Sequence, residues 1–421
     1  MKCTRAPIFT HNDLRQLEII IGDSFHVFSP QTFTRNLRSL KRHIGDASPQ
    51  SIVAYAMKAN YMPEILRLVA REGAWLEAAS DLEAKLALQH VPCTRIIFNG
   101  PQKCPDLSME IADRGGLVIL HSRRELTELL HRIPDGKLLN IGVRYNSSNN
   151  GPGSRFGFNL ENGDFQKCIE QIHLSRKLRI VALHCHYSTS QRSPTEFSRR
   201  LQTSIDIIER FNLDDIGYID IGGGLQGPVD THLEQYFASP IPTFADYSSE
   251  LARALKSRPD FLESGKTTLV VEPGVSLVAD SFVFVCKALE TTSDGKTINV
   301  QINSSLININ PTHSSTVLPP FVVSKRRPPS PPTTRVTIQG NTCMETDIIE
   351  DLPVNQAPYE GDYLVFQNRG AYSINRASSF IHARPGVVDT NGRILKKRES
   401  IDCILAEYDE QSNIRLPHDW D

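Results

Sequence analysis

Between Ser51 and Glu272 the sequence alternates short β-rich runs with longer stretches of helical periodicity. This alternation restricts the possible folds more than any other feature of the sequence. It is typical of parallel βα units. The eight expected strands are Ile52–Met57, Ala74–Ala78, Arg95–Phe98, Leu117–Leu120, Leu139–Arg144, Ile180–Cys185, Tyr218–Ile221 and Leu269–Val271. A segment long enough to return antiparallel follows each strand, so the sequence predicts an α/β protein with a closed, TIM-type (β/α)8 barrel over residues 30–275.

After Glu272 the β-rich runs follow one another without intervening amphipathic helices, which predicts a C-terminal antiparallel β domain. Its expected strands are Ser281–Leu289, Thr297–Ile302, Thr334–Gln339 and Asp362–Gln367. Phe25–Phe28 is a further strand, so we expect residues 1–29 and 276–421 to form this domain together. The basic, proline-rich stretch at 324–333 cannot support a strand ladder and is expected to be an exposed loop.

Charge and composition exclude several classes of partner. The 46 Lys and Arg nearly balance the 48 Asp and Glu of the 421 residues, so the chain has no basic field for nucleic acid or an acidic membrane surface. No apolar run approaches the ~20 residues of a membrane helix, and Asp13, Arg15 and Gln16 stand where a signal peptide would be apolar. The cysteines are scattered singly without a CxxC pair. We therefore expect a cytoplasmic protein with reduced thiols and no metal.

Polar residues stand at the carboxyl ends of the predicted strands, the face on which barrel enzymes place their chemistry. They are Lys58, Glu77, Asn99, His121, Arg144, His186, the Gly222-Gly223-Gly224 loop and Glu272. A structural protein has little reason to collect these residue types there. The pattern predicts an enzyme whose active site lies at this end of the barrel.

Lys58 follows a strand that would be buried on both faces, so its side chain must either reach solvent or be used. Desolvation lowers the pKa of an amine and makes it a nucleophile toward an aldehyde, of which pyridoxal phosphate is the obvious example. The alternative is a lysine that only extends from a strand end to water.

Three further strand ends support this cofactor. The backbone amides of Gly222 to Gly224 can approach a phosphate, Glu272 can keep a pyridine nitrogen protonated, and His186 can lie against the ring. Each has a structural alternative: the glycines can form a turn, and either His186 or His184 can be a satisfied core histidine.

Several motifs together resemble the fold-type III pyridoxal-phosphate amino-acid decarboxylases, the group with an alanine-racemase-type barrel that includes diaminopimelate and eukaryotic ornithine decarboxylases. The resemblance extends from Phe25 to about Phe380. It rests on YAMKAN at 55–60, SRFG at 154–157, HCHYST at 184–189, DIGGG at 220–224, EPG at 272–274, CMETD at 343–347 and GAY at 370–372.

The resemblance implies that Lys58 binds the cofactor covalently, that His186 stacks on its ring, and that Glu272 pairs with the pyridine nitrogen. The other cofactor-binding residues that it implies are Arg144, Thr189, Gly222, Gly223, Gly224, Gly274 and Tyr372. Cys343 would protonate the substrate, with Asp347 and Glu345 as substrate ligands, and this segment would reach the partner's site in a head-to-tail homodimer. Glu77 takes the place of an aspartate near the lysine. Glu83 also resembles a family glutamate, but Ser80–Glu83 has the pattern of a capping box, and we favour helix capping as its role.

Some positions depart from the family pattern. Val275 stands where an arginine usually follows EPG, so a phosphate contact is missing or comes from Arg369 or Arg376. Met344 replaces an acidic residue, and Asn310-Pro311 replaces the Arg-Pro pair that grips a distal carboxylate in diaminopimelate enzymes. These changes argue against diaminopimelate and simple ornithine enzymes and favour a siderophore-type or secondary-metabolism amino acid.

We therefore predict α-decarboxylation of an amino acid to an amine. Two alternatives remain open. A racemase or epimerase shares the barrel and the lysine but typically places arginine at the pyridine nitrogen, and a catalytically silent relative would act by binding a protein partner.

Overall fold

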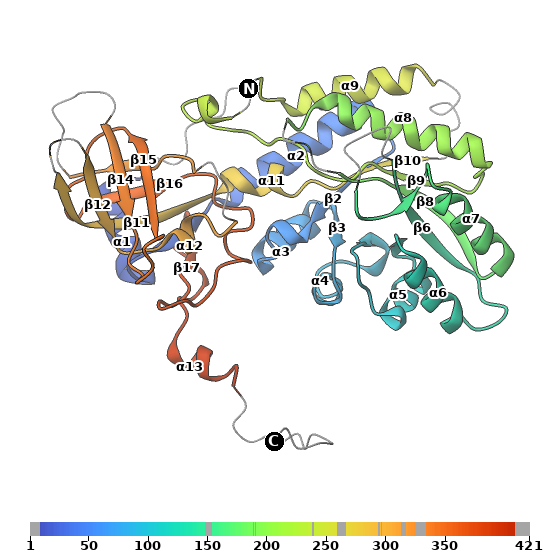
Figure 1. The fold of residues 1–421 in the computed structure, drawn as a ribbon, viewed down its shortest axis with the longest axis horizontal. Helices are drawn as coiled ribbons and strands as arrows, with labels where there is room; N and C mark the ends of the chain where they lie inside the picture. The colour runs from blue at the N-terminus through green and yellow to red at the C-terminus, as the bar shows by residue number, and fades with distance from the viewer. Residues whose placement is uncertain are drawn as a thin grey trace.

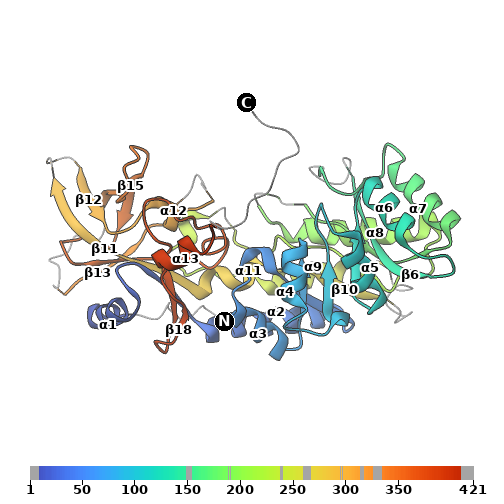
Figure 2. The same ribbon diagram turned by 90° about the horizontal axis from the view of Figure 1, so that it is seen from below.

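Two sheets dominate the protein and lie at opposite ends of the molecule, with the short helix α11 (Val275–Val278) between them (Figures 1 and 2). The computed structural model describes residues 9–147, 154–187, 189, 191–237, 240–258, 267–293, 295, 297–312, 317–325 and 334–408. Within these ranges no helix is long and apolar enough to cross a membrane.

The first sheet is a closed barrel of eight parallel strands, as the sequence predicts. Its order is β2-β3-β4-β5-β6-β8-β9-β10, and β10 pairs back onto β2. The strands are β2 (Ser51–Ala56), β3 (Trp75–Ala78), β4 (Ile96–Phe98), β5 (Leu117–Leu120), β6 (Leu139–Asn146), β8 (Leu178–His184), β9 (Tyr218–Asp220) and β10 (Thr268–Val271); the two-residue β7 (Phe158–Asn159) pairs with the end of β6. All eight predicted strands are confirmed, with ends that differ by one or two residues.

Helices connect the strands, but the eighth position differs from the expectation. Only the four-residue α11 follows β10, and α2 (Pro30–Ala47), which precedes β2, takes the missing place. The Ser248 hydroxyl of α9 donates to the His43 carbonyl of α2 over 2.5 Å. The other barrel helices are α3 (Pro63–Arg71), α4 (Asp81–Ala87), α5 (Pro105–Asp113), α6 (Arg123–Arg132), α7 (Asp164–Ser175), α8 (Pro194–Phe211) and α9 (Phe244–Lys256). Caps define their ends: α8, for example, begins after the Ser193 cap with proline as its first residue.

The second sheet is mostly antiparallel. Its order is β15-β14-β12-β11-β1-β17-β18, and β16 joins β11 to β13. The strands are β1 (Phe25–Phe28), β11 (Phe282–Ser293), β12 (Ile298–Ile302), β13 (Phe321–Val323), β14 (Thr334–Gln339), β15 (Ile348–Val354), β16 (Tyr363–Phe366), β17 (Gly386–Asp389) and β18 (Ile394–Lys396), with the short helices α12 (Leu306–Ile309) and α13 (Ile401–Leu405). The β1–β17 and β12–β14 pairs are parallel, which differs from the expected antiparallel sheet. Most of the proline-rich loop, residues 326–333, lies outside the described residues.

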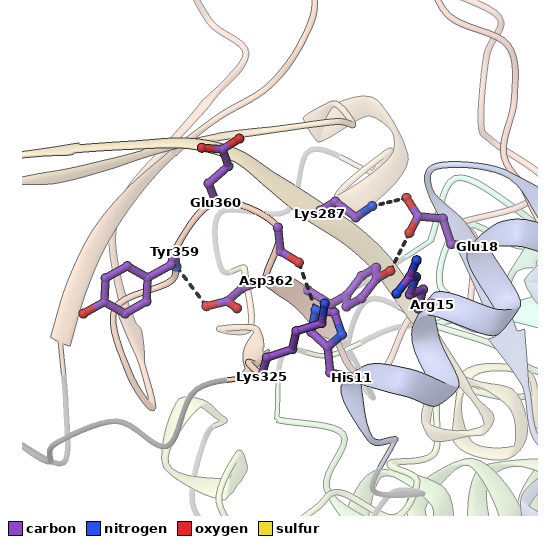
Figure 3. Close-up of a pocket in the computed structure, with 10 residues that line it drawn as sticks. His11, Arg15, Glu18, Lys287, Lys325, Tyr359, Glu360 and Asp362 are labelled. Atoms are coloured by element: carbon purple, nitrogen blue, oxygen red, sulfur yellow. Dashed lines mark hydrogen bonds and ion pairs between the residues drawn. The ribbon is translucent and has the colours of Figure 1, made fainter.

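The N-terminal helix α1 (His11–Ile21) is attached to this second sheet. Glu18 of α1 pairs with Lys287 of β11 and accepts a hydrogen bond from the Tyr363 hydroxyl, and a ring nitrogen of His11 lies 3.1 Å from the Gly361 carbonyl oxygen (Figure 3). These residues line a pocket of about 290 Å³. None of the residues predicted to carry the chemistry lines it.

A segment of the C-terminal half returns to the first barrel strand. The Tyr372 amide donates to the Ala59 carbonyl over 2.8 Å, and Asn60 donates to the Gly370 carbonyl over 2.9 Å. Gly370 comes so close to α11 that an added Cβ would stand 1.8 Å from the Val278 carbonyl oxygen. The GAY segment therefore packs directly against the turn that carries Lys58.

We predict that Gly370→Ala lowers the free energy of unfolding by about 1–3 kcal/mol, because the new methyl group must push backbone apart. Gly45→Ala is the matched control: nothing lies within 4 Å of its added Cβ in α2, so it should raise stability by about 0.5–1 kcal/mol. Urea denaturation of both variants measures the difference. Equal midpoints for the two variants would contradict the close packing at Gly370.

Candidate active site

The carboxyl ends of the barrel strands bring most of the predicted polar residues together. One cluster contains six of them together with His184 and Asp220, and all but Lys58 and His186 are buried. The six are Lys58, Glu77, Asn99, Arg144, His186 and Glu272. His121 belongs elsewhere, since it contacts the Gly100 carbonyl and the edge of the Phe156 ring. Beside it, the buried ion pair of Lys103 and Glu125 completes a structural network.

Lys58 lies in a short 3-10 turn, Met57–Ala59, directly after β2, and its side chain is 38% exposed. Its ammonium donates to Glu77 over 2.5 Å. Burial alone would lower the pKa of Lys58, but the negative charges of Glu77 and Glu272 outweigh burial and hold the pKa above its usual range. The expectation of a lowered pKa is therefore wrong: without a bound aldehyde, Lys58 is an ammonium ion paired with Glu77.

Glu272 follows β10 and is held by buried polar groups. Nε2 of His184 lies 3.2 Å from its carboxylate, and Asn99 donates to its other oxygen over 3.5 Å. Burial lowers the pKa of His184 well below its usual range, so the imidazole is neutral. Burial and the neighbouring Glu272 raise the pKa of Asp220 well above its usual range, which favours the neutral form of Asp220.

His184, Asp220 and Glu272 place their polar atoms within 4.8 Å of one another, a spacing that a metal ion could also use. In the structure, Nε2 of His184 contacts the Glu272 carboxylate directly, and the Gly222 amide donates to Asp220. The sequence prediction of no metal site stays a prediction.

The glycine loop is tightly packed, and two of its three amides are already used. The Gly222 amide donates to Asp220 over 2.8 Å, and the Gly223 amide donates to Nδ1 of His186 over 3.0 Å. An added Cβ on Gly223 would stand 2.2 Å from the Glu272 carbonyl oxygen. Gly224 has the only amide of the three for which the described residues supply no acceptor. The loop thus fixes the His186 ring and leaves one amide for a phosphate.

The remaining predicted cofactor residues surround this centre. Arg144 is buried and donates to the His186 carbonyl over 2.7 Å, while its Nε has no acceptor among the described residues. Gly274 lets the turn after β10 approach Lys58, because its added Cβ would stand 2.9 Å from Ala59. Thr189 is half-buried, and its hydroxyl accepts from the Arg192 amide. Tyr372, with a positive φ of 61°, lies near Lys58 on the docked GAY segment.

The residues predicted to act on the substrate lie in the second domain. Cys343 and Glu345 are exposed, whereas Asp347 is buried in its own loop. Its carboxylate accepts from the Ser305 hydroxyl, the Leu306 amide and both the amide and hydroxyl of Thr342. Asp347 therefore shapes the loop that presents Cys343, and its role as a substrate ligand stays a prediction.

Arg369 and Arg376 are the two arginines that could replace the phosphate contact missing at Val275. Among the described residues, neither contacts the glycine loop. Arg369 is buried over the Phe366 ring in the second domain, where burial lowers its pKa to about 10. Arg376 is exposed.

The Ser80 hydroxyl caps α4 by accepting from the Glu83 amide, but the Glu83 carboxylate accepts from the Ala79 amide and not from Ser80, so the expected capping box is only half formed. Burial raises the pKa of Glu83 to about 6.

These residues fit pyridoxal phosphate. The loop at Gly222 and Gly223 leaves no room for side chains, Gly224 offers an amide, and Arg144 keeps an unused donor beside Lys58. A closed barrel with a lysine after β2 and a buried carboxylate after β10 defines the class of pyridoxal-phosphate barrel enzymes.

Within this class the chain belongs to the pyridoxal-dependent decarboxylases, because the model of their pyridoxal binding domain matches residues 30–279. The chain is similar to a diaminopimelate decarboxylase of Aquifex aeolicus, at 24% identity over 93% of both chains. It is 26% identical to a probable chloroplastic diaminopimelate decarboxylase of Oryza sativa, over 92% of this chain and 80% of that one.

The fold also matches a solved structure. The crystal structure of diaminopimelate decarboxylase from M. jannaschii shares the fold with a TM-score of 0.82 at 23% identity, over 96% of this chain and 94% of that chain. The protein is thus an amino-acid carboxy-lyase that depends on pyridoxal phosphate.

His184 and Asp220 are the site residues that the sequence analysis left without a role. His184 ends β8 two residues before His186, and Asp220 ends β9 and opens the DIGGG motif, so the sequence carried a signal for both residues. The sequence alone could not show that both residues lie close to Glu272.

We predict that Glu77→Gln shifts the attachment of pyridoxal phosphate to Lys58 toward lower pH. The neutral amine reacts with the aldehyde, and loss of the Glu77 charge lowers the Lys58 pKa, so the amine is deprotonated at lower pH. Stopped-flow absorbance of the apoprotein mixed with the cofactor across a pH series measures the shift. Glu110→Gln, which breaks an exposed pair with Arg114, is the control; identical profiles for all three proteins would show that Glu77 does not set the Lys58 pKa.

Proposed function

We propose that this protein removes the α-carboxylate of an amino acid as carbon dioxide, with Lys58 binding the aldehyde of pyridoxal phosphate. The observation that carries the proposal is the contact of Lys58 with Glu77 in the same buried cluster as Glu272. It combines an amine that can hold the cofactor with a carboxylate that can hold the pyridine proton.

When bound, the cofactor supplies an electron sink for the charge left on the α-carbon. Glu272 holds a proton at the pyridine nitrogen, and Asn99 and His184 keep the carboxylate in place. The His186 ring is fixed through the Gly223 amide, so it can cover one face of the cofactor and exclude water. Arg144 fixes the backbone of His186 and adds positive charge near Lys58.

An acidic residue at this position favours decarboxylation over the racemase alternative, since such racemases typically place arginine at the pyridine nitrogen. The silent-relative alternative is disfavoured because Lys58, His186 and Cys343 are all retained.

The substrate proposed here lacks a distal carboxylate. Asn310 stands in place of the arginine that would bind such a group, and it caps α12 in the second domain. Glu345 is exposed two residues after Cys343 and could accept a hydrogen bond from a distal amine or amide. These features favour an amino acid that is larger or less basic than lysine, as in siderophore or other secondary metabolism.

A substrate panel tests this proposal. Carbon dioxide release is measured with meso-diaminopimelate, lysine, ornithine, arginine and lysine hydroxylated or acylated on its distal nitrogen. We expect kcat/KM for a modified lysine to exceed that for meso-diaminopimelate by at least about tenfold. A preference for meso-diaminopimelate would overturn the substrate proposal and leave the reaction unchanged.

We predict that Glu272→Gln slows carbon dioxide release by about 100- to 1,000-fold while the cofactor still binds, because glutamine keeps the size but cannot hold the pyridine proton. Glu250→Gln, which weakens a surface pair with Arg253 and leaves an amide oxygen to accept from the Ser198 hydroxyl, should retain the wild-type rate. Single-turnover kinetics separates the chemical step from substrate binding. A rate within threefold of wild type would show that another group sets the electron sink.

We further propose that a homodimer shares its active sites, with Lys58 from one chain and Cys343 from the other. Cys343 is exposed on a loop of the second domain, which Asp347 holds in shape. Because the Cys343 side chain is exposed, it is free to reach the active site of a neighbouring protomer instead of the barrel of its own chain.

Mixing Lys58→Ala with Cys343→Ala subunits tests the shared site. Under random pairing about half of the dimers are heterodimers, and one of the two sites in each heterodimer has both residues. Activity should therefore recover to about a quarter of the wild-type value. Each variant alone is the control and should stay impaired. Native mass spectrometry must show that heterodimers formed; heterodimers without recovered activity would mean that each site belongs to a single chain.

A further inference from the structure

Arg200 is a buried cation whose described hydrogen bonds include no carboxylate. It lies within α8, is 2% exposed, and its guanidinium stands 4.3 Å from the Tyr187 ring centroid and 4.5 Å from that of Phe197. Its Nε has no acceptor among the described residues. A buried positive charge is costly unless an anion compensates it. Nothing in the mechanism above uses this charge.

Arg200 donates to three main-chain carbonyls in the two loops around His186 and the glycines. Nη1 donates to Ile221 over 2.9 Å and to Gly223 over 3.0 Å, and Nη2 donates to Tyr187 over 2.6 Å. One planar group therefore fixes the end of β9 and the residue after His186 at the same time.

This contact also orients the free amide of the glycine loop. In a trans peptide the C=O and N–H groups point in opposite directions. Because the Gly223 carbonyl points toward Arg200, the Gly224 N–H points away from it. The amides of Gly222 and Gly223 are already taken by Asp220 and His186. Arg200 thus turns outward the one amide of the three that has no described acceptor.

We propose that Arg200 is a positioning residue for the cofactor phosphate, which holds the Gly224 amide outward and supplies positive charge from behind the loop. It compensates for Val275, which offers no cation at the start of α11. The phosphate dianion is the anion that balances the buried guanidinium. The inference rests on the cofactor of the family and concerns only the residue that prepares its phosphate site.

Binding of two cofactor analogues to the apoprotein tests this role without catalysis. Pyridoxamine 5′-phosphate and pyridoxamine both lack the aldehyde, so neither reacts with Lys58, and they differ only in the phosphate. Isothermal titration calorimetry gives the ratio of their dissociation constants. Wild type must bind the phosphorylated analogue; failure at this step would count against the cofactor site itself and not against Arg200.

We predict that Arg200→Met weakens binding of pyridoxamine 5′-phosphate about 10- to 100-fold and changes binding of pyridoxamine less than about threefold. Arg200→Lys should bind pyridoxamine 5′-phosphate more weakly than wild type but more tightly than Arg200→Met. Lysine keeps the charge but cannot donate to three carbonyls in a fixed fork. Arg199→Met is the matched control on the same helix, since Arg199 is 44% exposed and only pairs with Glu196.

Equal weakening of both analogues would show that Arg200 only supports the fold, and an unchanged ratio in a folded variant would overturn the proposal. Circular dichroism and thermal unfolding establish whether Arg200→Met folds. If it does not, Arg200→Lys decides alone: a selective loss for the phosphorylated analogue supports the proposal, and a wild-type ratio rejects it.

Discussion

The pairing of β10 with β2 is the constraint on which the rest of the structure depends. It aligns Leu269 with Ser51 and Val271 with Val53, closes the barrel, and places Lys58 and Glu272 at neighbouring strand ends. The Ala56 amide then donates to Pro273 over 3.0 Å, and Gly274 allows the two turns to touch. The raised pKa of Lys58 follows from this closure, because Glu272 adds its charge to that of Glu77.

The sequence predicted the barrel well because its strands are apolar runs bounded by polar residues, a local signal. It did not predict α2 as the eighth helix, since that placement depends on contacts of α2 with α9 and with the Leu277–Asp280 segment. It also missed β15, which contains Pro353 and acidic residues; proline is tolerated there because β15 is the edge of the second sheet.

For the candidate site, the sequence indicated which strand ends carry chemistry but not how their groups interact. The protonated state of Lys58 depends on two carboxylates that are distant in sequence, and burial alone suggested the opposite direction. The glycine motif predicted a phosphate loop, whereas the use of two of its amides by Asp220 and His186 is a tertiary contact. Arg200 gave no signal because an arginine within an amphipathic helix usually faces solvent.

The place of β1 in the second sheet has a consequence for the order in which the chain can fold. Phe25–Phe28 pairs with β11 on one side and β17 on the other, and both are synthesised after the whole barrel. Until then β1 is an apolar strand with two open edges, the kind of segment that associates with other chains. The Ser29 cap and Pro30 join β1 directly to α2, so early folding of the barrel keeps the waiting strand attached to a structured unit. The second sheet can therefore be completed only after the last strand of the barrel has been synthesised.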